Sequence, residues 1–370
     1  MSVALLAVLS AVELRAQAPD PVPLDADALV ELAGVQTELG EFQTAQANYL
    51  AGIERLAAQN GEYAPALIGP YAGLAQAYLR NGQAAEAITV LEQARHISQR
   101  NFGLLNVEQV GLLDEMSRAY LLVGDTVEAQ NLQRERLTLA LRRFGENDPQ
   151  VIPFRNRLAD YYDRSRMRVR AREQYEAVLA IQREHFGEAD GRMLVPLSEL
   201  VRIDILLGDR SSARRRLLRV LESAGNATAA QTGGALAALG DWELALGRTE
   251  TAAAYYRDAY TTLHGEDPAA AAEYFAAPRL INFVPPPSPG AQRGNRVAYA
   301  WGWIEVRFSV SADGRATGVG IVQANPAGLM DARYLERLAE ATYRPRFVDG
   351  EAVDTAAVAY RHAFRYFVAE

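Results

Sequence analysis

The stretch that decides the fold is YAGLAQAYLRNGQAAEAITVLEQA, residues 71–94. Leu74 and Tyr78 stand four residues apart, so they share one face of a helix. Gly82 then allows that helix to end in a left-handed conformation at little cost. Apolar residues resume at helical spacing, with Leu91 among them. The stretch therefore predicts two successive helices joined by a tight turn.

The same pattern recurs along the chain, at spacings of 42 residues with a last one of 39. An alanine follows each turn position by five residues, and its small side chain allows the second helix to pack closely on the first. Six units in register predict an array of helical hairpins. We expect less regular packing in repeats three and four, where Gln133 replaces an apolar residue and an arginine replaces the glycine. The turn positions are Gly40, Gly82, Gly124, Arg166, Gly208 and Gly247, and the alanines are Ala45, Ala87, Ala129, Ala171, Ala213 and Ala252.

These units resemble the tetratricopeptide repeat, over residues 27–265. The usual unit has about 34 residues, so the additional residues here lengthen the helices or the loops. Turns such as RFGENDPQV, residues 143–151, resemble the longer, kinesin-light-chain-like variety. The resemblance implies a mainly α protein, a right-handed solenoid whose first helices line a concave surface.

A polar strip is expected on that concave surface, because the positions two before and two after each packing leucine face away from it. A strip of mixed sign suits a peptide or protein segment, and a merely solvated face is the alternative. The alternating arginines between Arg164 and Arg172 are expected to spread around a helix and to be solvated. The expected groove residues are Gln76, Asp114, Arg118, Asn156, Asp160, Ser198 and Arg202.

The pattern changes after the array. Residues 266–296 contain three consecutive prolines, which predict a linker or an extended covering strand. Apolar and polar residues then alternate over 304–310, as in a half-buried strand, and ATGVGIVQA, residues 316–324, predicts its partner. A helix at 331–341 and a last strand within 355–368 complete a small α+β unit of order β-β-α-β, over residues 297–370.

This unit resembles the C-terminal domain of TonB and its relatives, in GWIEVRFSVSADGRATGVGIV (302–322) and YRPRFVDGEAV (343–353). In that family the helix leaves through an aromatic residue, a basic residue and a proline, which here are Tyr343, Arg344 and Pro345. Phe347 is then expected to anchor the core of the domain. Unlike TonB itself, this chain shows no membrane helix and no long proline-rich spacer, so we do not expect it to transduce energy alone.

The TonB resemblance implies a periplasmic location and a partner segment that adds to an open sheet edge. We expect the backbone of the final strand to be that edge, although RLINFVPPP, residues 279–287, is an alternative occupant. The residues on one side of this strand are Val358, Tyr360, His362, Phe364 and Tyr366.

The N-terminal residues predict a signal peptide over 1–18. An apolar run, VALLAVLSAV (3–12), precedes the small-residue site Ala16-Gln17-Ala18, and an extended spacer follows over 19–26. Because Met1-Ser2 carries no basic side chain, an uncleaved amphipathic helix is the alternative. No other run reaches the 18 apolar residues of a membrane span, so no lasting span is expected.

Composition and motifs argue against several classes of protein. The net charge of −8 and pI near 5.3 disfavour a nucleic-acid binder, and the absence of Cys excludes disulfides and thiolate catalysis. No phosphate-binding, dinucleotide-binding or nucleophile motif occurs. The four histidines show no metal-binding spacing. We expect a non-enzyme without catalytic residues, cofactor or metal.

These expectations combine into a periplasmic scaffold or adaptor for protein or peptide partners, such as outer-membrane transporters or other envelope proteins. The concave groove would hold one partner and the sheet edge another. The alternative is a TonB-family component of energy-coupled outer-membrane transport, with the motor supplied by other proteins. An enzyme with an unrecognised site is a third and weaker hypothesis.

Overall fold

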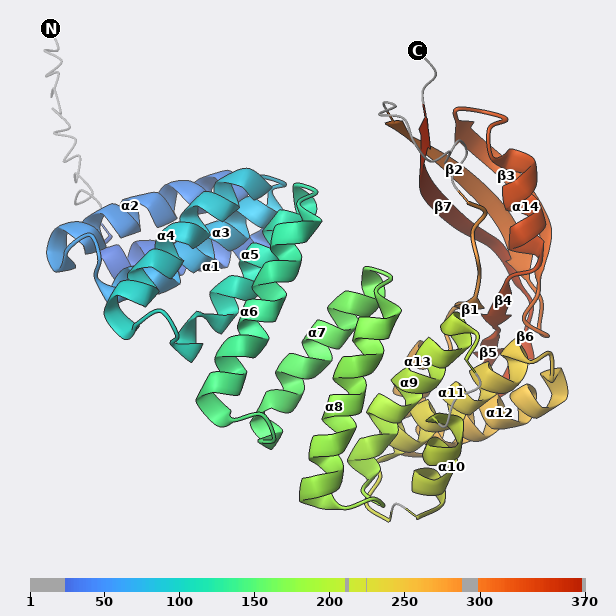
Figure 1. Cartoon of the computed structure of the whole chain (residues 1–370). Helices are drawn as coiled ribbons and strands as arrows, with labels where there is room; N and C mark the ends of the chain where they lie inside the picture. The colour runs from blue at the N-terminus through green and yellow to red at the C-terminus, as the bar shows by residue number, and fades with distance from the viewer. Residues whose placement is uncertain (1–23, 210–212, 224, 288–298, 368–370) are drawn as a thin grey trace, which may run out of the picture. The chain divides into compact units, whose positions relative to one another are not determined.

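The computed structural model describes residues 24–209, 213–223, 225–287 and 299–367. The expected signal peptide, most of the expected spacer and the end of the proline-containing segment lie outside these ranges. The chain divides into two compact units, Met1–Leu139 and Ala140–Glu370, with the boundary inside one helix. Figure 1 shows the helices and strands that make up the two units.

The first unit is a series of helical hairpins. Short 3-10 turns, η1 (Pro65–Leu67) and η2 (Val107–Gln109), lead into the first helices of the second and third pairs. The helices are α1 (Ala26–Leu39), α2 (Phe42–Asn60), α3 (Ile68–Arg80), α4 (Ala84–Phe102), α5 (Val110–Leu122) and α6 (Thr126–Phe144), of which α6 crosses the boundary.

The second unit continues the hairpins and adds a sheet module. Two more 3-10 turns, η3 (Pro149–Val151) and η4 (Gly191–Met193), precede first helices. Its helices are α7 (Ile152–Arg164), α8 (Arg168–Phe186), α9 (Leu194–Leu207), α10 (Ala213–Ser223), α11 (Ala229–Ala245), α12 (Thr249–Glu266) and α13 (Pro268–Tyr274). The described residues thus contain six helix pairs, α1/α2 to α11/α12, as the repeat predicted.

The additional length of each repeat lies in two places. The second helices α2, α4, α6 and α8 each have 19 residues, against 13 or 14 in α1, α3, α5, α7 and α9. The 3-10 turns that precede the first helices account for the rest. The sequence left open whether helices or loops were longer, and the structure shows that both are.

The alanine of each repeat is buried as predicted, with at most 1% of its surface exposed. Leu74, Leu91 and Ala94 are fully buried as well, so both helices of the quoted stretch face the core. The close approach of helices within each pair therefore depends on these small residues. The six alanines are Ala45, Ala87, Ala129, Ala171, Ala213 and Ala252.

The C-terminal module contains three small sheets and one helix. Its central sheet has the order β3-β2-β7, all antiparallel. Its elements are β1 (Arg279–Asn282), β2 (Tyr299–Val310), β3 (Ala316–Asn325), α14 (Asp331–Ala339), β4 (Thr342–Arg344), β5 (Arg346–Val348), β6 (Glu351–Val353) and β7 (Thr355–Phe367). Tyr334 and Leu338 of α14 join Ile304, Val306 and Phe364 in one core, so the predicted β-β-α-β unit is present with short strands added.

The segment expected to be a linker contains secondary structure. Helix α13 and strand β1 lie within 266–296, and β1 pairs with β4 rather than with β7. The expectation of a covering strand was therefore correct in kind, but its partner differs. Figure 1 shows β1, β4, β5 and β6 beside α11 and α12.

Phe347 corrects a second expectation. It lies not in the core of the sheet module but in a cluster with Tyr256, Tyr260 and Phe275 of the last helices, and only 3% of it is exposed. Three residues earlier along β4–β5, the buried Arg344 donates two hydrogen bonds to Asp241 of α11, at 2.9 and 2.6 Å. The stretch YRPRFVDGEAV therefore fastens the module to the array.

Candidate functional site

Strand β7 is an edge of the central sheet. Its pairing with β2 runs without a register shift from Tyr299↔Phe367 to Phe308↔Val358, and no described strand pairs with its other side. Strand β3, at the opposite edge, has two register shifts and a left-handed Gly318, with φ of 60°. Irregularities of this kind discourage further strand pairing, so β7 is the more regular of the two edges.

The side chains expected on one side of β7 do share that side, and all of them except Tyr360 pack against the module's own core. His362 and Phe364 are buried, and His362 stacks on Tyr334 with ring centroids 5.1 Å apart. Val358 and Tyr366 pack against the same core, whereas Tyr360 is 38% exposed. A partner at this edge would therefore meet mainly backbone groups.

The expected groove residues of the first unit are in different environments. Gln76 is exposed on α3. On α5, Arg118 pairs with Glu115, while Asp114 accepts a hydrogen bond from Gln133 at 3.2 Å. A polar network thus links α5 and α6. It consists of Asp114, Gln133 and Arg136, whose guanidinium lies 3.5 Å from the Asp114 carboxylate. This network explains how repeat three accommodates Gln133 in place of an apolar residue.

Two of the expected groove residues of the second unit are held by structural hydrogen bonds. Asp160 accepts from the Tyr175 hydroxyl at 2.7 Å, and Ser198 donates to the Leu194 carbonyl at 2.7 Å. The half-buried Asn156 has a buried Oδ1 without a hydrogen-bond partner among the described residues. Only Ser198 and Arg202 come together, at a cavity of about 120 Å³.

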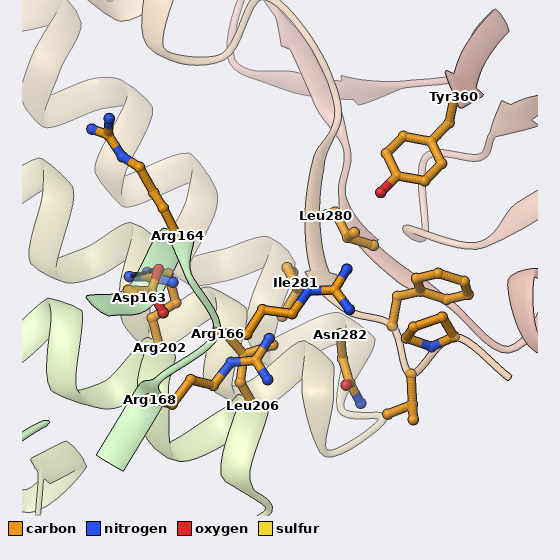
Figure 2. Close-up of a pocket in the computed structure, with 13 residues that line it drawn as sticks. Asp163, Arg164, Arg166, Arg168, Arg202, Leu206, Leu280, Ile281, Asn282 and Tyr360 are labelled. Atoms are coloured by element: carbon orange, nitrogen blue, oxygen red, sulfur yellow. Dashed lines mark ion pairs between the residues drawn. The ribbon is translucent and has the colours of Figure 1, made fainter. Parts of the chain in front are cut away.

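A larger cavity, of about 310 Å³, lies where the α7–α8 turn and α9 meet the segment from β1 to Pro285 (Figure 2). Its charged lining comprises four arginines and one aspartate, and it includes Arg202 and Tyr360 from the two expected sites. The other arginines, Arg164, Arg166 and Arg168, were expected to be solvated around a helix. Arg164 and Arg166 are exposed as expected, whereas Arg168 is half-buried. The expected spread around one helix was wrong, because α7 ends at Arg164 and α8 begins at Arg168, so Arg166 lies in the turn between the two helices.

Arg166 holds an unusual backbone conformation in this turn. The glycines at the equivalent position of the other five repeats have φ between 68° and 85°, and Arg166 has φ of 61°. A residue with a Cβ pays roughly 1–2 kcal/mol for this left-handed conformation. Such strain occurs most often at functional sites. The break in the glycine pattern was thus the sequence signal for this cavity.

We expect Arg166→Gly to raise the free energy of unfolding by about 1 kcal/mol, because it relieves this strain. Urea unfolding of the full chain, with wild type alongside, measures the change. Arg164→Gly is the matched control, since Arg164 ends a helix without left-handed φ and glycine there is destabilising by about 0.5–1 kcal/mol. Equal destabilisation by both substitutions would contradict strain at Arg166.

The charges around this cavity are only partly balanced. Arg202 lies 2.9 Å from Asp163 and 2.7 Å from Glu199. Burial lowers the pKa of Arg168, Asp163 opposes that change, and Arg166 and Arg202 lower it further. Burial also lowers the pKa of His362, and the positive charge of Arg166 adds to this effect. Arg166 therefore acts electrostatically on the sheet module as well as on the array.

Metal sites and membrane spans are both absent from the part of the chain that the structure describes. The described residues contain no group of three or more His, Asp or Glu side chains placed to hold a metal ion. None of the described helices combines the length and the apolar character that a membrane span requires.

Comparison with known families bears on the first unit. The tetratricopeptide repeat model matches residues 69–94, which cover most of α3, the Gly82 turn and the first half of α4. Residues 69–94 are thus similar to a tetratricopeptide repeat. The other helix pairs of the tetratricopeptide-like array share its turn position and its buried alanine. No protein of curated function matches the chain in sequence.

Solved structures of helical repeat proteins are similar to parts of this chain. A Q17M variant of a putative kinesin light chain from Podosopora anserina, with nearly identical tetratricopeptide-like repeats, is 25% identical, covering 52% of this chain and 92% of its own, with a TM-score of 0.43. BtubC from P. vanneervenii is 17% identical over 74% of this chain and all of its own, with a TM-score of 0.46. A Rap protein in complex with Competence and Sporulation Factor is 16% identical, covering 68% and 67%, with a TM-score of 0.37. TM-scores this low support no functional conclusion.

Proposed function

We propose that this protein is a non-enzymatic interaction scaffold of the periplasm, which binds an extended segment of a partner protein along β7. The tetratricopeptide-like array would offer further contact sites in each unit by itself, at the exposed Gln76 in the first and at the cavities near Arg202 in the second. The signal-peptide pattern of residues 1–18 and the TonB resemblance support the location. That resemblance also supports strand addition, since the TonB family binds partner segments at a sheet edge.

The observation that carries this proposal is the regular edge of β7, with which no described strand pairs. An edge strand presents a row of backbone donors and acceptors that a second chain can pair with. Natural proteins usually blunt such an edge with bulges, as β3 does at both register shifts. The only shift in β7 lies near its start, by Ala357, where φ is 59°. The strand beyond it is a suitable template for partner backbone.

Photo-crosslinking tests the proposal with the full chain. A photoreactive amino acid is placed at Ala359 or Ala363, both exposed on β7, and for comparison at Val322, which is 49% exposed on β3. We expect the same partner to be captured from both β7 positions and not from Val322. Point insertions are preferable to truncation after residue 280, because truncation would remove Arg344 and Phe347 from the buried contacts with the last helices.

Two outcomes would contradict the proposal. Equal capture at Val322 would mean that β7 is not the preferred edge, and capture only by a probe at Gln76 would move recognition to the array. If the partner captured at β7 is a periplasmic segment of an outer-membrane transporter, the alternative of a component of energy-coupled transport gains support.

A further inference from the structure

The cavity of about 310 Å³ in the second unit has unbalanced positive charge. Among the described residues, Arg164, Arg166 and Arg168 form no ion pair, and the single aspartate of the lining is already 2.9 Å from Arg202. The Nε of Arg168 is buried without a hydrogen-bond partner in this part of the chain. Arg168 is half-buried, and a cation partly withdrawn from water is costly unless something neutralises it. Arg166 is exposed at the mouth of the cavity and adds a second positive charge beside it.

Two of these arginines are aimed at the same space. Figure 2 shows the guanidinium groups of Arg166 and Arg168 extending toward Asn282, whereas that of Arg164 is turned away. Guanidinium groups match the planar, bidentate geometry of carboxylate and phosphate oxygens. The pair is therefore suited to hold one oxyanion between the array and β1.

The rest of the lining is mostly apolar. The apolar wall is formed by Leu206 of α9 and by the segment from Leu280 to Pro285. Tyr360 of β7 also lines the cavity. Ligand pockets generally begin at roughly 300 Å³ and combine apolar walls with a few polar groups. A ligand for this cavity would need a small apolar body next to its charged group.

We propose that this cavity binds a small oxyanion with an apolar body, a carboxylate or a phosphate ester, between Arg166 and Arg168. Contact between the Arg166 side chain and this anion explains why the fourth repeat carries a strained arginine where the other five have glycine. The inference does not rest on strand addition at β7, because the two guanidinium groups belong to the array.

Isothermal titration calorimetry of the full chain tests this inference with three probes of similar shape. The anions 3-phenylpropanoate and phenyl phosphate are expected to bind, and the neutral 3-phenylpropanamide to bind at least about tenfold more weakly, as the loss of a charge-assisted hydrogen bond implies. The tighter of the two anions identifies a carboxylate or a phosphate ester as the source. Affinity for both anions should fall as salt is added.

Variants connect the binding to the named residues. Arg168→Gln and Arg166→Gly should each weaken anion binding at least about tenfold and leave the amide unchanged. Arg166→Gly is expected to be more stable than wild type, so a loss of binding would not reflect unfolding. Arg170→Gln is the matched control, since Arg170 is exposed near the start of the same helix and outside the lining.

Three results would overturn the inference. The first is that the amide binds as tightly as the anions. The second is that Arg168→Gln binds the anions as tightly as wild type, and the third is that no probe binds at millimolar concentration. None of these would bear on β7, whose crosslinks at Ala363 are expected to persist in Arg168→Gln. Loss of the β7 crosslinks alone would leave the anion site intact.

Discussion

Asp241→Ala is expected to lower the free energy of unfolding by about 3–5 kcal/mol. It would leave Arg344 as an uncompensated charge, in a site where the side chains of Arg344 and Asp241 are only 3% and 8% exposed. The two hydrogen bonds between them, and a third that the Tyr256 hydroxyl donates to Asp241 at 2.9 Å, would all be lost. Asp241 holds the pKa of Arg344 above its ordinary value although burial alone would lower it, so loss of the carboxylate cannot simply be relieved by deprotonation.

Urea unfolding with hydrogen exchange measures this effect. Replacement of both partners, as in Asp241→Leu with Arg344→Met, should recover most of the loss, because buried pairs replaced by apolar residues are often neutral. Glu38→Ala is the exposed control. The side chains of Glu38 and its partner Arg80 are 68% and 44% exposed, so their ion pair adds at most about 1 kcal/mol to the free energy of unfolding. A loss from Asp241→Ala no greater than that of Glu38→Ala would mean that the buried pair does not fasten the sheet module.

Phe347→Ala should cost about 3–5 kcal/mol, through lost burial and the cavity that it leaves. The ring lies 5.0 Å from Phe275 and 5.8 Å from Tyr256, measured between centroids, in a cluster made mostly by α11, α12 and α13. The backbone hydrogen bond from Phe347 to the Phe275 carbonyl, at 3.2 Å, remains available in the variant, so the effect isolates the side chain.

The location of the effect is as informative as its size. Hydrogen exchange should show lost protection in β4, β5 and β6, with α3 and α4 of the other unit unchanged. Phe347→Leu keeps most of the apolar volume and should cost less than about 1.5 kcal/mol. Equal losses from both substitutions would mean that the apolar volume of Phe347 is not what stabilises the contact. A loss of protection confined to α14 and β2 would place Phe347 in the module's own core, as the sequence suggested.

Local patterns were sufficient to predict most of the elements. The turn glycines, the alanines that follow them and the alternation of Ile304, Val306, Phe308 and Val310 each act within a few residues. The glycines hold the expected left-handed turns, and the alanines and the four strand residues are buried as expected. The contact between Arg344 and Asp241 joins residues 103 apart in sequence. A pattern in one element does not identify its partner, so Phe347 and β1 were assigned to the wrong neighbours.

The candidate cavity was missed for a related reason. The arginines from Arg164 to Arg172 were read as one continuous helix, in which alternate residues point in different directions. The helix stops at Arg164, and a left-handed Arg166 redirects the chain. The substitution of arginine for glycine was visible in the sequence, but it was interpreted as a packing irregularity rather than as a reason to keep that side chain.

The proximity of Arg344 and Phe347 along the chain has a mechanical consequence. Only Pro345 and Arg346 lie between them. Arg344 is held by Asp241 of α11, and Phe347 packs in the cluster made mostly by α11, α12 and α13. A pull applied to a strand paired with β7 would travel through the sheet and leave it by this short segment. The force would then act on the last helices through two attachment points that lie close together in the chain, rather than being taken up by a flexible linker.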